Sequence, residues 1–411
     1  MVSQAVWFLK NYLHKIWVRA TSFAILAVLT VALAQVASRF LPTEWTDLVE
    51  ANAVDALLGI LASSMLAVTT FSLSIAVSAF AAAANTTTPR ATALLQEDTT
   101  TQNVLATFLG AFLFGLVGMV ALKAGYYSQS GLLVLYVATA AVITLVVIVL
   151  LRWIGHLMTF GRVEDTLDRV EDAAVAAIER RIRNPWMGGV PRTKSPPQDA
   201  YAVYSKTTGY VQHIDMIALS EQAEALGIRL WISAVPGTFV HTSDPLFHVE
   251  GGEIGDADLT ELCKGVTIER QRTFDQDPRF GLIVMSEIAA RALSPSVNDP
   301  GTAIGVIGRL VRVLSNWQRD VDADIAFPRI IVPGLQADEL LEHSFRSIAR
   351  DGAGMAEVQI RLQKALAALA RGDADTFGEP ARDLARDALQ RAKDAGLRHD
   401  EMAELRKASM L

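Results

Sequence analysis

Hydroxyl side chains recur at helical spacing within one long apolar run of the sequence, residues 54–84. At about 100° per residue, Ser63, Thr70, Ser74 and Ser78 fall on one stripe of a helix, and Asn85 continues it. Two interpretations stand side by side. The hydroxyls either bond to carbonyls of their own helix and allow close packing, or they line a wet path in which they replace part of an ion's hydration.

Charged residues follow this run in the segment 85–102. If several copies assemble around the run, Arg90 and Asp98 are candidates for a charged ring at its cytoplasmic mouth. The alternative is that Arg90 extends to the membrane interface and that a helix begins near Thr88, before Pro89.

A second polar constellation lies far along the chain, where one predicted helix (279–293) ends and another begins. A tight loop at a helix N-terminus offers backbone donors suited to an anion or to a polar group of a partner. The candidate ligand-binding residues there are Glu287, Arg291, Ser294, Asn298 and Asp299. The competing interpretation is structural, because Asp299 is a good N-cap and Pro300 suits the first helical position.

Signatures of catalysis are absent from the sequence. It contains no nucleophile elbow, Walker loop, HExxH motif, dinucleotide-binding fingerprint or kinase set, so we expect no enzyme, no catalytic residue and no cofactor. The single cysteine, Cys263, excludes an intramolecular disulfide and a cysteine-based metal cluster. His213 and Asp215 share one face of a predicted strand, but their spacing matches no ligand signature, and we predict no metal site.

Four apolar runs must position these side chains. They cover about 20–38, 54–84, 103–124 and 131–154. Each is long enough to cross a bilayer as a helix, which takes about 20 residues, and the second is long enough to project beyond the bilayer or to tilt strongly. No carboxylate lies in mid-membrane in any of them, which argues against a pump coupled through a buried acid. Small residues spaced by three or four in the third run, among them Ala111, Gly115 and Gly118, predict close helix packing.

Lysine and arginine flank the runs unequally, which sets the expected orientation. The cytoplasmic side would carry Lys10, Lys15, Arg19, Arg90, Arg152 and Arg162, against Arg39 and Lys123 on the other side. We therefore expect a multi-pass protein of a bacterial inner membrane with both termini in the cytoplasm.

The expected fold is a polytopic α-helical membrane domain of four transmembrane helices plus a cytoplasmic α+β domain, with a small β-sandwich-like module and a helical C-terminal part. The helix after the fourth run is expected to continue that span into the cytoplasm. The predicted segments are an interfacial amphipathic segment 1–19, the transmembrane domain 20–155, a juxtamembrane helix 156–183, a linker 184–199, the β-rich module 200–252, an α+β domain 253–350 and C-terminal helices 351–411.

Several stretches, taken in order, resemble the bacterial predicted membrane proteins of the domain of unknown function 2254 family. They are FSLSIAVSAFAAAANTTTPRATALLQED, TFLGAFLF, GYVQHID and FDQDPRFGL followed by EIAARALSPSVNDPGTA. The last stretch is the most specific, since Asp277-Pro278, Phe280-Gly281 and Asn298-Asp299-Pro300 match the family's signature. The resemblance implies this architecture and no established function.

The leading functional hypothesis is a homo-oligomeric channel or passive transport protein for ions, lined by the second run and gated by the cytoplasmic domain. Four spans of one copy can hardly enclose a pore, so self-association is required. The alternative is a membrane-anchored sensor or scaffold that binds a small anionic ligand or a partner protein. With a net charge of -7 and no clustered basic face, the chain is not expected to bind nucleic acid.

Overall fold

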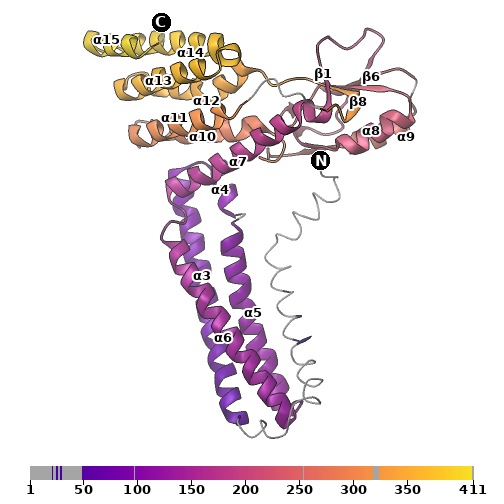
Figure 1. Ribbon diagram of the computed structural model, residues 1–411, viewed down its shortest axis with the longest axis vertical. Coiled ribbons are helices and arrows are strands. Elements are labelled where there is room, and N and C mark those ends of the chain that lie inside the picture. Colours follow the sequence, from indigo (N-terminus) through magenta and orange to yellow (C-terminus); the bar gives the residue numbers. More distant parts are fainter. Residues whose placement is uncertain are drawn as a thin grey trace. The chain divides into compact units, whose positions relative to one another are not determined.

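The computed structural model describes residues 49–96, 98–252, 254–317 and 324–409, together with residues 21, 25, 28 and 29. The predicted segment 1–19 and all but four positions of the first predicted span, 20–38, lie outside the described residues. The described chain forms two units (Figure 1). One contains residues 49–85 and 92–165, and the other contains 86–91 and 166–409.

Three helices of the first unit are long and apolar enough to cross a membrane, among the residues that the structure describes. They are α3 (Ala51–Thr86), α5 (Thr99–Lys123) and α6 (Gln129–Leu157), and they contain the second, third and fourth predicted spans. At 36 residues, α3 is about 54 Å long, well beyond the roughly 30 Å of a hydrocarbon core.

Small residues let two of these helices approach closely, as the sequence predicts. A Cβ on Gly115 of α5 would lie 3.1 Å from the carbonyl oxygen of Leu58 and 3.2 Å from the Cβ of Ala62, both on α3. A Cβ on Gly118 would lie 3.3 Å from the Leu58 side chain. The packing of α3 against α5 therefore depends on glycine at the contact.

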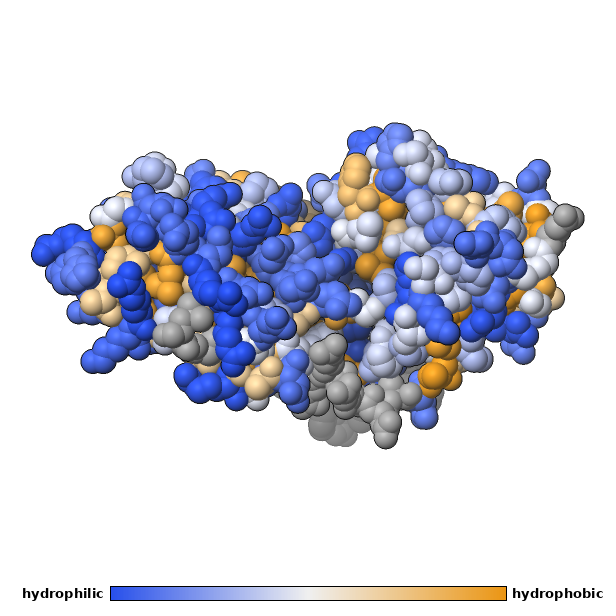
Figure 2. Space-filling view, turned by 90° about the horizontal axis from the view of Figure 1, so that it is seen from above, coloured by the Kyte–Doolittle hydropathy of each residue, from blue (hydrophilic) through white to orange (hydrophobic). Residues whose placement is uncertain are grey.

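Large apolar side chains of this unit are exposed to an extent unusual for a water-soluble protein. Ile60 and Phe71 are 65% and 68% exposed, and Val120, Leu151 and Ile154 are also open. By contrast, Figure 2 shows a face of the molecule on which hydrophilic residues dominate and hydrophobic ones gather only in small patches. Contiguous exposed apolar surface of this kind suits lipid.

The helix expected to continue from the fourth span through residues 155–183 is interrupted. α6 ends at Leu157 and α7 (Val163–Arg183) begins after a turn. Gly161 in this turn has a φ of +78°, a left-handed conformation that a right-handed helix cannot contain. A Cβ at Gly161 would also lie 3.0 Å from the carbonyl oxygen of Ala79. The prediction of one continuous helix is therefore wrong.

Two sheets organise the β-rich part of the second unit. One has the order β1-β8-β4-β6-β2 and the other the order β5-β3-β7. The strands are β1 (Gly189–Pro191), β2 (Tyr201–Tyr204), β3 (Gly209–Ile214), β4 (Arg229–Ile232), β5 (Phe239–Val240), β6 (Pro245–Glu250), β7 (Val266–Glu269) and β8 (Phe327–Val332). The sheets thus extend beyond the predicted module 200–252, because β1, β7 and β8 complete them from outside that range.

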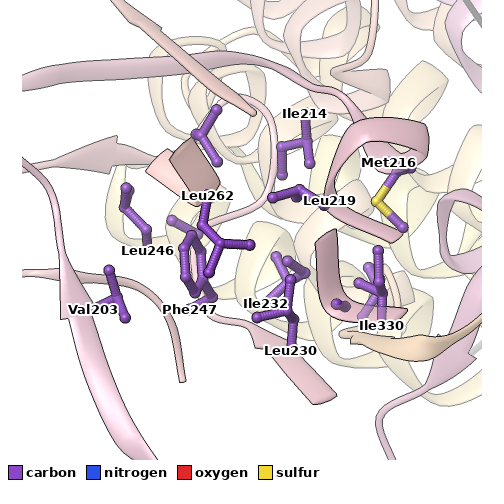
Figure 3. Close-up of a cluster of buried hydrophobic side chains, with 14 of the residues drawn as sticks. Val203, Ile214, Met216, Leu219, Leu230, Ile232, Leu246, Phe247, Leu262 and Ile330 are labelled. Carbon is purple, nitrogen blue, oxygen red and sulfur yellow. The ribbon is translucent and has the colours of Figure 1, made fainter. Parts of the chain in front are cut away.

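Both sheets share one hydrophobic core (Figure 3). Phe247 and Ile330 from the larger sheet meet Ile214 from the smaller one, and Leu219 and Leu262 cover them from α8 (Met216–Ala225) and α9 (Asp256–Lys264). Along β6, the apolar residues Leu246, Phe247 and Val249 are buried in this core, whereas His248 and Glu250 are half-buried.

The rest of this unit is helical. Its helices are α10 (Pro278–Ala292), α11 (Pro300–Ser315), α12 (Ala337–Asp351), α13 (Ala356–Gly372), α14 (Ala374–Asp394) and α15 (His399–Ala408). A network of ion pairs joins α7 to α11. Arg309 pairs with Asp168 and Glu171, and the Nε of Arg312 donates a hydrogen bond of 2.8 Å to Glu171. α10 packs directly on α7, where a Cβ on Gly281 would lie 2.4 Å from the Cβ of Ala174.

Alanine at Gly281 should destabilise this unit, since its Cβ would force α7 and α10 apart. We expect a loss of about 1–3 kcal/mol, the range typical of overpacked contacts. Gly305 of α11 is the matched control, because its Cβ would meet nothing within 4 Å. Gly305→Ala should raise stability by up to about 1 kcal/mol. Thermal unfolding of the full chain in detergent measures both changes, and equal shifts of the same sign would contradict the contact.

Candidate functional site

The hydroxyl stripe lies on a surface of α3. Ser63, Thr70, Ser74, Ser78 and Asn85 are all exposed in a single copy. The hydroxyls of three of them donate to carbonyls one turn back: Ser63 to Gly59 at 2.8 Å, Thr70 to Leu66 at 2.9 Å and Ser78 to Ser74 at 2.9 Å. The hydrogen bonds to carbonyls of the same helix, which the packing interpretation predicts, are therefore present. The stripe does not, however, pack against α5 or α6.

A different polar set on α3 packs inside the unit. The Ser72 side chain is buried and accepts a hydrogen bond of 3.0 Å from the indole Nε1 of Trp153 on α6. Trp153 in turn stacks on His156, whose ring lies 4.9 Å from that of Phe160. Ser72 thus takes part in the contact of α3 with α6, and the hydroxyl stripe on the exposed surface of α3 does not.

Arg90 and Asp98, the residues predicted at the cytoplasmic mouth, belong to different units. The Asp98 carboxylate is 6% exposed, accepts a hydrogen bond of 2.6 Å from the Thr101 backbone as N-cap of α5, and lies 3.1 Å from Nε2 of His156. Arg90, near the start of α4 (Pro89–Gln96), forms an ion pair with Glu287 of α10. In one copy, Asp98 is therefore held inside its unit and is not presented at the surface.

The predicted ligand-binding loop has mostly structural contacts. Asp299 caps α11 as the structural interpretation predicted: its carboxylate accepts hydrogen bonds from the backbone and hydroxyl of Thr302, at 3.1 and 2.6 Å. These bonds hold the pKa of the Asp299 carboxyl below its usual value. The Ser294 hydroxyl donates to the Arg291 carbonyl at 2.7 Å. Asn298 adopts a φ of +50°, which asparagine tolerates in tight turns.

Glu287 is the member of that constellation with a distant partner. Burial raises the pKa of its carboxyl, and the charge and hydrogen bond of Arg90 work in the opposite direction. This ion pair joins residues from two separate predictions: Arg90 was predicted at the cytoplasmic mouth of a pore, and Glu287 was predicted in the ligand-binding set. It lies within the second unit, to which residues 86–91 belong.

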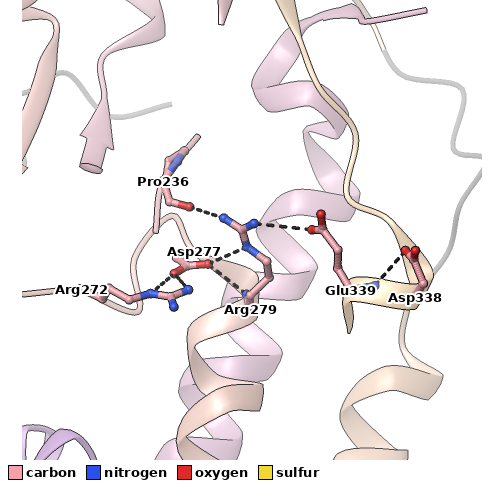
Figure 4. A network of polar contacts seen from close by, with 6 residues as sticks. All are labelled: Pro236, Arg272, Asp277, Arg279, Asp338 and Glu339. Carbon is pink, nitrogen blue, oxygen red and sulfur yellow. Dashed lines mark hydrogen bonds and ion pairs between the residues drawn. The ribbon is translucent and has the colours of Figure 1, made fainter. Parts of the chain in front are cut away.

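The most buried charge network of this unit centres on Asp277 (Figure 4). Asp277 is only 2% exposed. Its carboxylate caps α10 by accepting a hydrogen bond of 3.1 Å from the Arg279 backbone N–H, and it accepts another of 2.9 Å from Nε of Arg272. The Arg279 guanidinium lies against the same carboxylate, donates to the Pro236 carbonyl at 2.9 Å and reaches Glu339 at 3.6 Å. The carboxylate is therefore enclosed by cations.

Glycine at position 237 makes room for this carboxylate. Gly237 has a φ of +87°, and a Cβ there would lie 2.0 Å from the Asp277 Oδ2. The guanidinium groups of Arg272 and Arg279 occupy the Asp277 carboxylate, and no cluster of potential metal ligands occurs among the residues described.

Comparison with known families agrees with this architecture. The family model described as "Predicted membrane protein (DUF2254)" matches residues 14–368. The chain belongs to the DUF2254 family. The match takes in the three candidate spans, both sheets and the helices through most of α13.

Curated relatives share the family's lack of assigned function. An uncharacterized protein of Mycobacterium tuberculosis (strain ATCC 25618 / H37Rv) and one of Mycobacterium bovis are each 28% identical over 236 residues. The alignment covers 53% of this chain and 43% of each relative, so the chain spans less than half the length of these relatives. No solved structure matches the chain.

Sequence reasoning missed the arginines that enclose Asp277 in this DUF2254 protein. The Asp277-Pro278 pair indicates a helix start, and it was visible in the signature. Arg272, Arg279 and the partly exposed Glu339 carry no local motif, because they come together only through the tertiary fold.

Replacing Asp277 by asparagine should destabilise the second unit by about 3 kcal/mol or more, because two largely buried guanidiniums lose their counter-charge. Asparagine still caps a helix, so the change isolates the charge. Asp275→Asn is the control: its carboxylate is half-exposed beside Arg180, and its loss should cost at most about 1 kcal/mol. Chemical unfolding of the full chain in detergent, followed by tryptophan fluorescence, compares them. Equal losses would contradict the central role of Asp277.

Proposed function

We propose that the chain is a homo-oligomeric membrane channel or passive transport protein for ions, in which α3 of several copies lines the path. The observation that carries the proposal is the exposure of the whole hydroxyl stripe. Ser63, Thr70, Ser74 and Ser78 lie on a surface that α5 and α6 leave open, while Ser72 serves the internal packing.

The hydrogen bonding of the stripe favours cations as the permeant species. Ser63, Thr70 and Ser78 already donate their hydroxyl protons to carbonyls of α3. What a hydroxyl oxygen then offers outward is its lone pairs, which accept hydrogen bonds and coordinate positive charge. A ring of such oxygens replaces part of the hydration shell of a cation.

Apolar residues flank the stripe and would make the contacts between copies. At about 100° per residue, Phe71 lies on one side of the hydroxyl line, and Leu66 and Leu73 lie on the other. All three are large and exposed in a single copy. Neighbouring copies that bury these flanks would leave the hydroxyls facing a common axis.

The alternative function is a membrane-anchored sensor or scaffold, in which the spans only anchor the second unit. The observation that favours it is a buried arginine of that unit, Arg181, which forms no ion pair with the described residues. In this case the hydroxyls of α3 face lipid, which their internal hydrogen bonds permit.

Flux through reconstituted protein separates the two functions. Changing Ser63, Thr70, Ser74 and Ser78 together to alanine should alter cation flux on the order of tenfold, the factor that about 1.4 kcal/mol of lost ion stabilisation corresponds to. Thr144→Ala is the matched control, because Thr144 is an exposed hydroxyl of α6 that donates to the Ala140 carbonyl at 2.9 Å. It should leave the flux unchanged.

Planar-bilayer recording under varied voltage, pH and tension, and ion flux into liposomes, provide the readouts. An oligomeric preparation that conducts no ion under any of these conditions would overturn the channel. So would a quadruple variant that conducts like the unaltered protein.

A further inference from the structure

Arg181 occupies a position where α7 otherwise buries apolar or small side chains. The buried face of this helix runs through Leu167, Val170, Ala174 and Ile178 at spacings of three and four, and Arg181 continues it. Arg181 is 8% exposed, so the fold has taken most of this charged side chain out of water.

Several other arginines of the second unit have counter-charges. The ion pairs join Arg90 to Glu287, Arg180 to Asp275, Arg272 to Asp277, and Arg279 to both Asp277 and Glu339. Arg181 takes part in no hydrogen bond or ion pair with the described residues. Among the described residues, Arg181 therefore has no carboxylate paired directly with it.

The surroundings of Arg181 are positively charged. Burial, together with the nearby positive charge of Arg279, lowers the pKa of the Arg181 guanidinium to about 10, against the opposing effect of Asp277. The group therefore remains charged at neutral pH. Its neighbour Asp277 supplies little free negative charge, because Arg272 and Arg279 already hold that carboxylate.

A histidine on another element responds to the same positive charge. Burial lowers the pKa of His343 on α12, and the charges of Arg279 and Arg272 lower it further, while Glu339 and Asp277 work in the opposite direction. The N-terminal end of α10, which begins beside Asp277, adds the positive end of a helix dipole. The lowered pKa of His343 and the start of α10 agree with a positive potential around Arg279.

A buried guanidinium without a partner is strongly unfavourable, and proteins normally pair it. Its planar set of N–H donors matches the oxygens of a phosphate, to which arginine binds through two parallel hydrogen bonds. We propose that Arg181, flanked by Arg279, binds a phosphate-class oxyanion in the second unit. Glu339 is only 3.6 Å from the Arg279 guanidinium and half-exposed, so it competes with the anion for Arg279. This site does not depend on conduction through α3.

Binding of inorganic phosphate to the full chain tests the site, with the protein held in nanodiscs of neutral lipid. Calorimetry should show saturable binding, and phosphate should raise the unfolding temperature, whereas sodium chloride at equal ionic strength should not. Arg181→Gln should weaken the affinity roughly tenfold or more, the loss expected for charge-assisted hydrogen bonds. The same variant should be at least as stable as the unaltered protein when phosphate is absent, because an unpaired buried charge is removed.

Two further variants distinguish a ligand site from a structural role. Glu339→Gln should tighten phosphate binding several-fold, since it removes the competing carboxylate, and a purely structural arginine would produce no such gain. Arg183→Gln is the matched control on α7, where the arginine is exposed and pairs with Glu179. It should bind phosphate like the unaltered protein.

A second arm identifies the source of the phosphate group. Nanodiscs that contain phosphatidylglycerol, with no added phosphate, should raise the unfolding temperature through Arg181 only if a lipid headgroup is the ligand. Stabilisation by free phosphate alone supports a soluble ligand. Absence of saturable binding in both arms, or unchanged binding by Arg181→Gln, overturns the proposal, whatever the flux measurements on α3 give.

Discussion

The buried carboxylate of Asp277 is the interaction on which the second unit depends. It caps α10, and it draws Arg272 from the segment after β7 and Arg279 from the first turn of α10 to one point. Through Arg279 the network also reaches the Pro236 carbonyl in the turn between β4 and β5, and Glu339 on α12. Sheets and helices meet at this point, and a left-handed glycine at 237 is required to let the carboxylate in.

Polar residues on α3 have two separate tasks. Ser72 is buried against Trp153 and belongs to the packing of the first unit. The stripe that contains Ser63 and Thr70 points away from that packing and satisfies its own donors within the helix. Because the two sets do not overlap, a change to the stripe can test a membrane function without disturbing the unit that carries it.

Local signals in the sequence predicted what local physics decides. The apolar runs predicted the positions of α3, α5 and α6, and the pair Asp299-Pro300 begins α11 because a cap and a preset φ need no distant partner. The prediction of a continuous helix after α6 was wrong, because Gly161 adopts a left-handed turn within the helical pattern around it. The Asp277 network could not be predicted, since its partners lie on elements whose contact only the tertiary fold creates.

The pair formed by Arg90 and Glu287 sets an order of events during synthesis. Arg90 leaves the ribosome before α5 and α6, and its partner follows 197 positions later. The second unit is therefore not one continuous piece of chain: residues 92–165 interrupt it. This ion pair can close only after both intervening apolar helices have been made, so the second unit is completed later than the apolar helices it encloses in sequence.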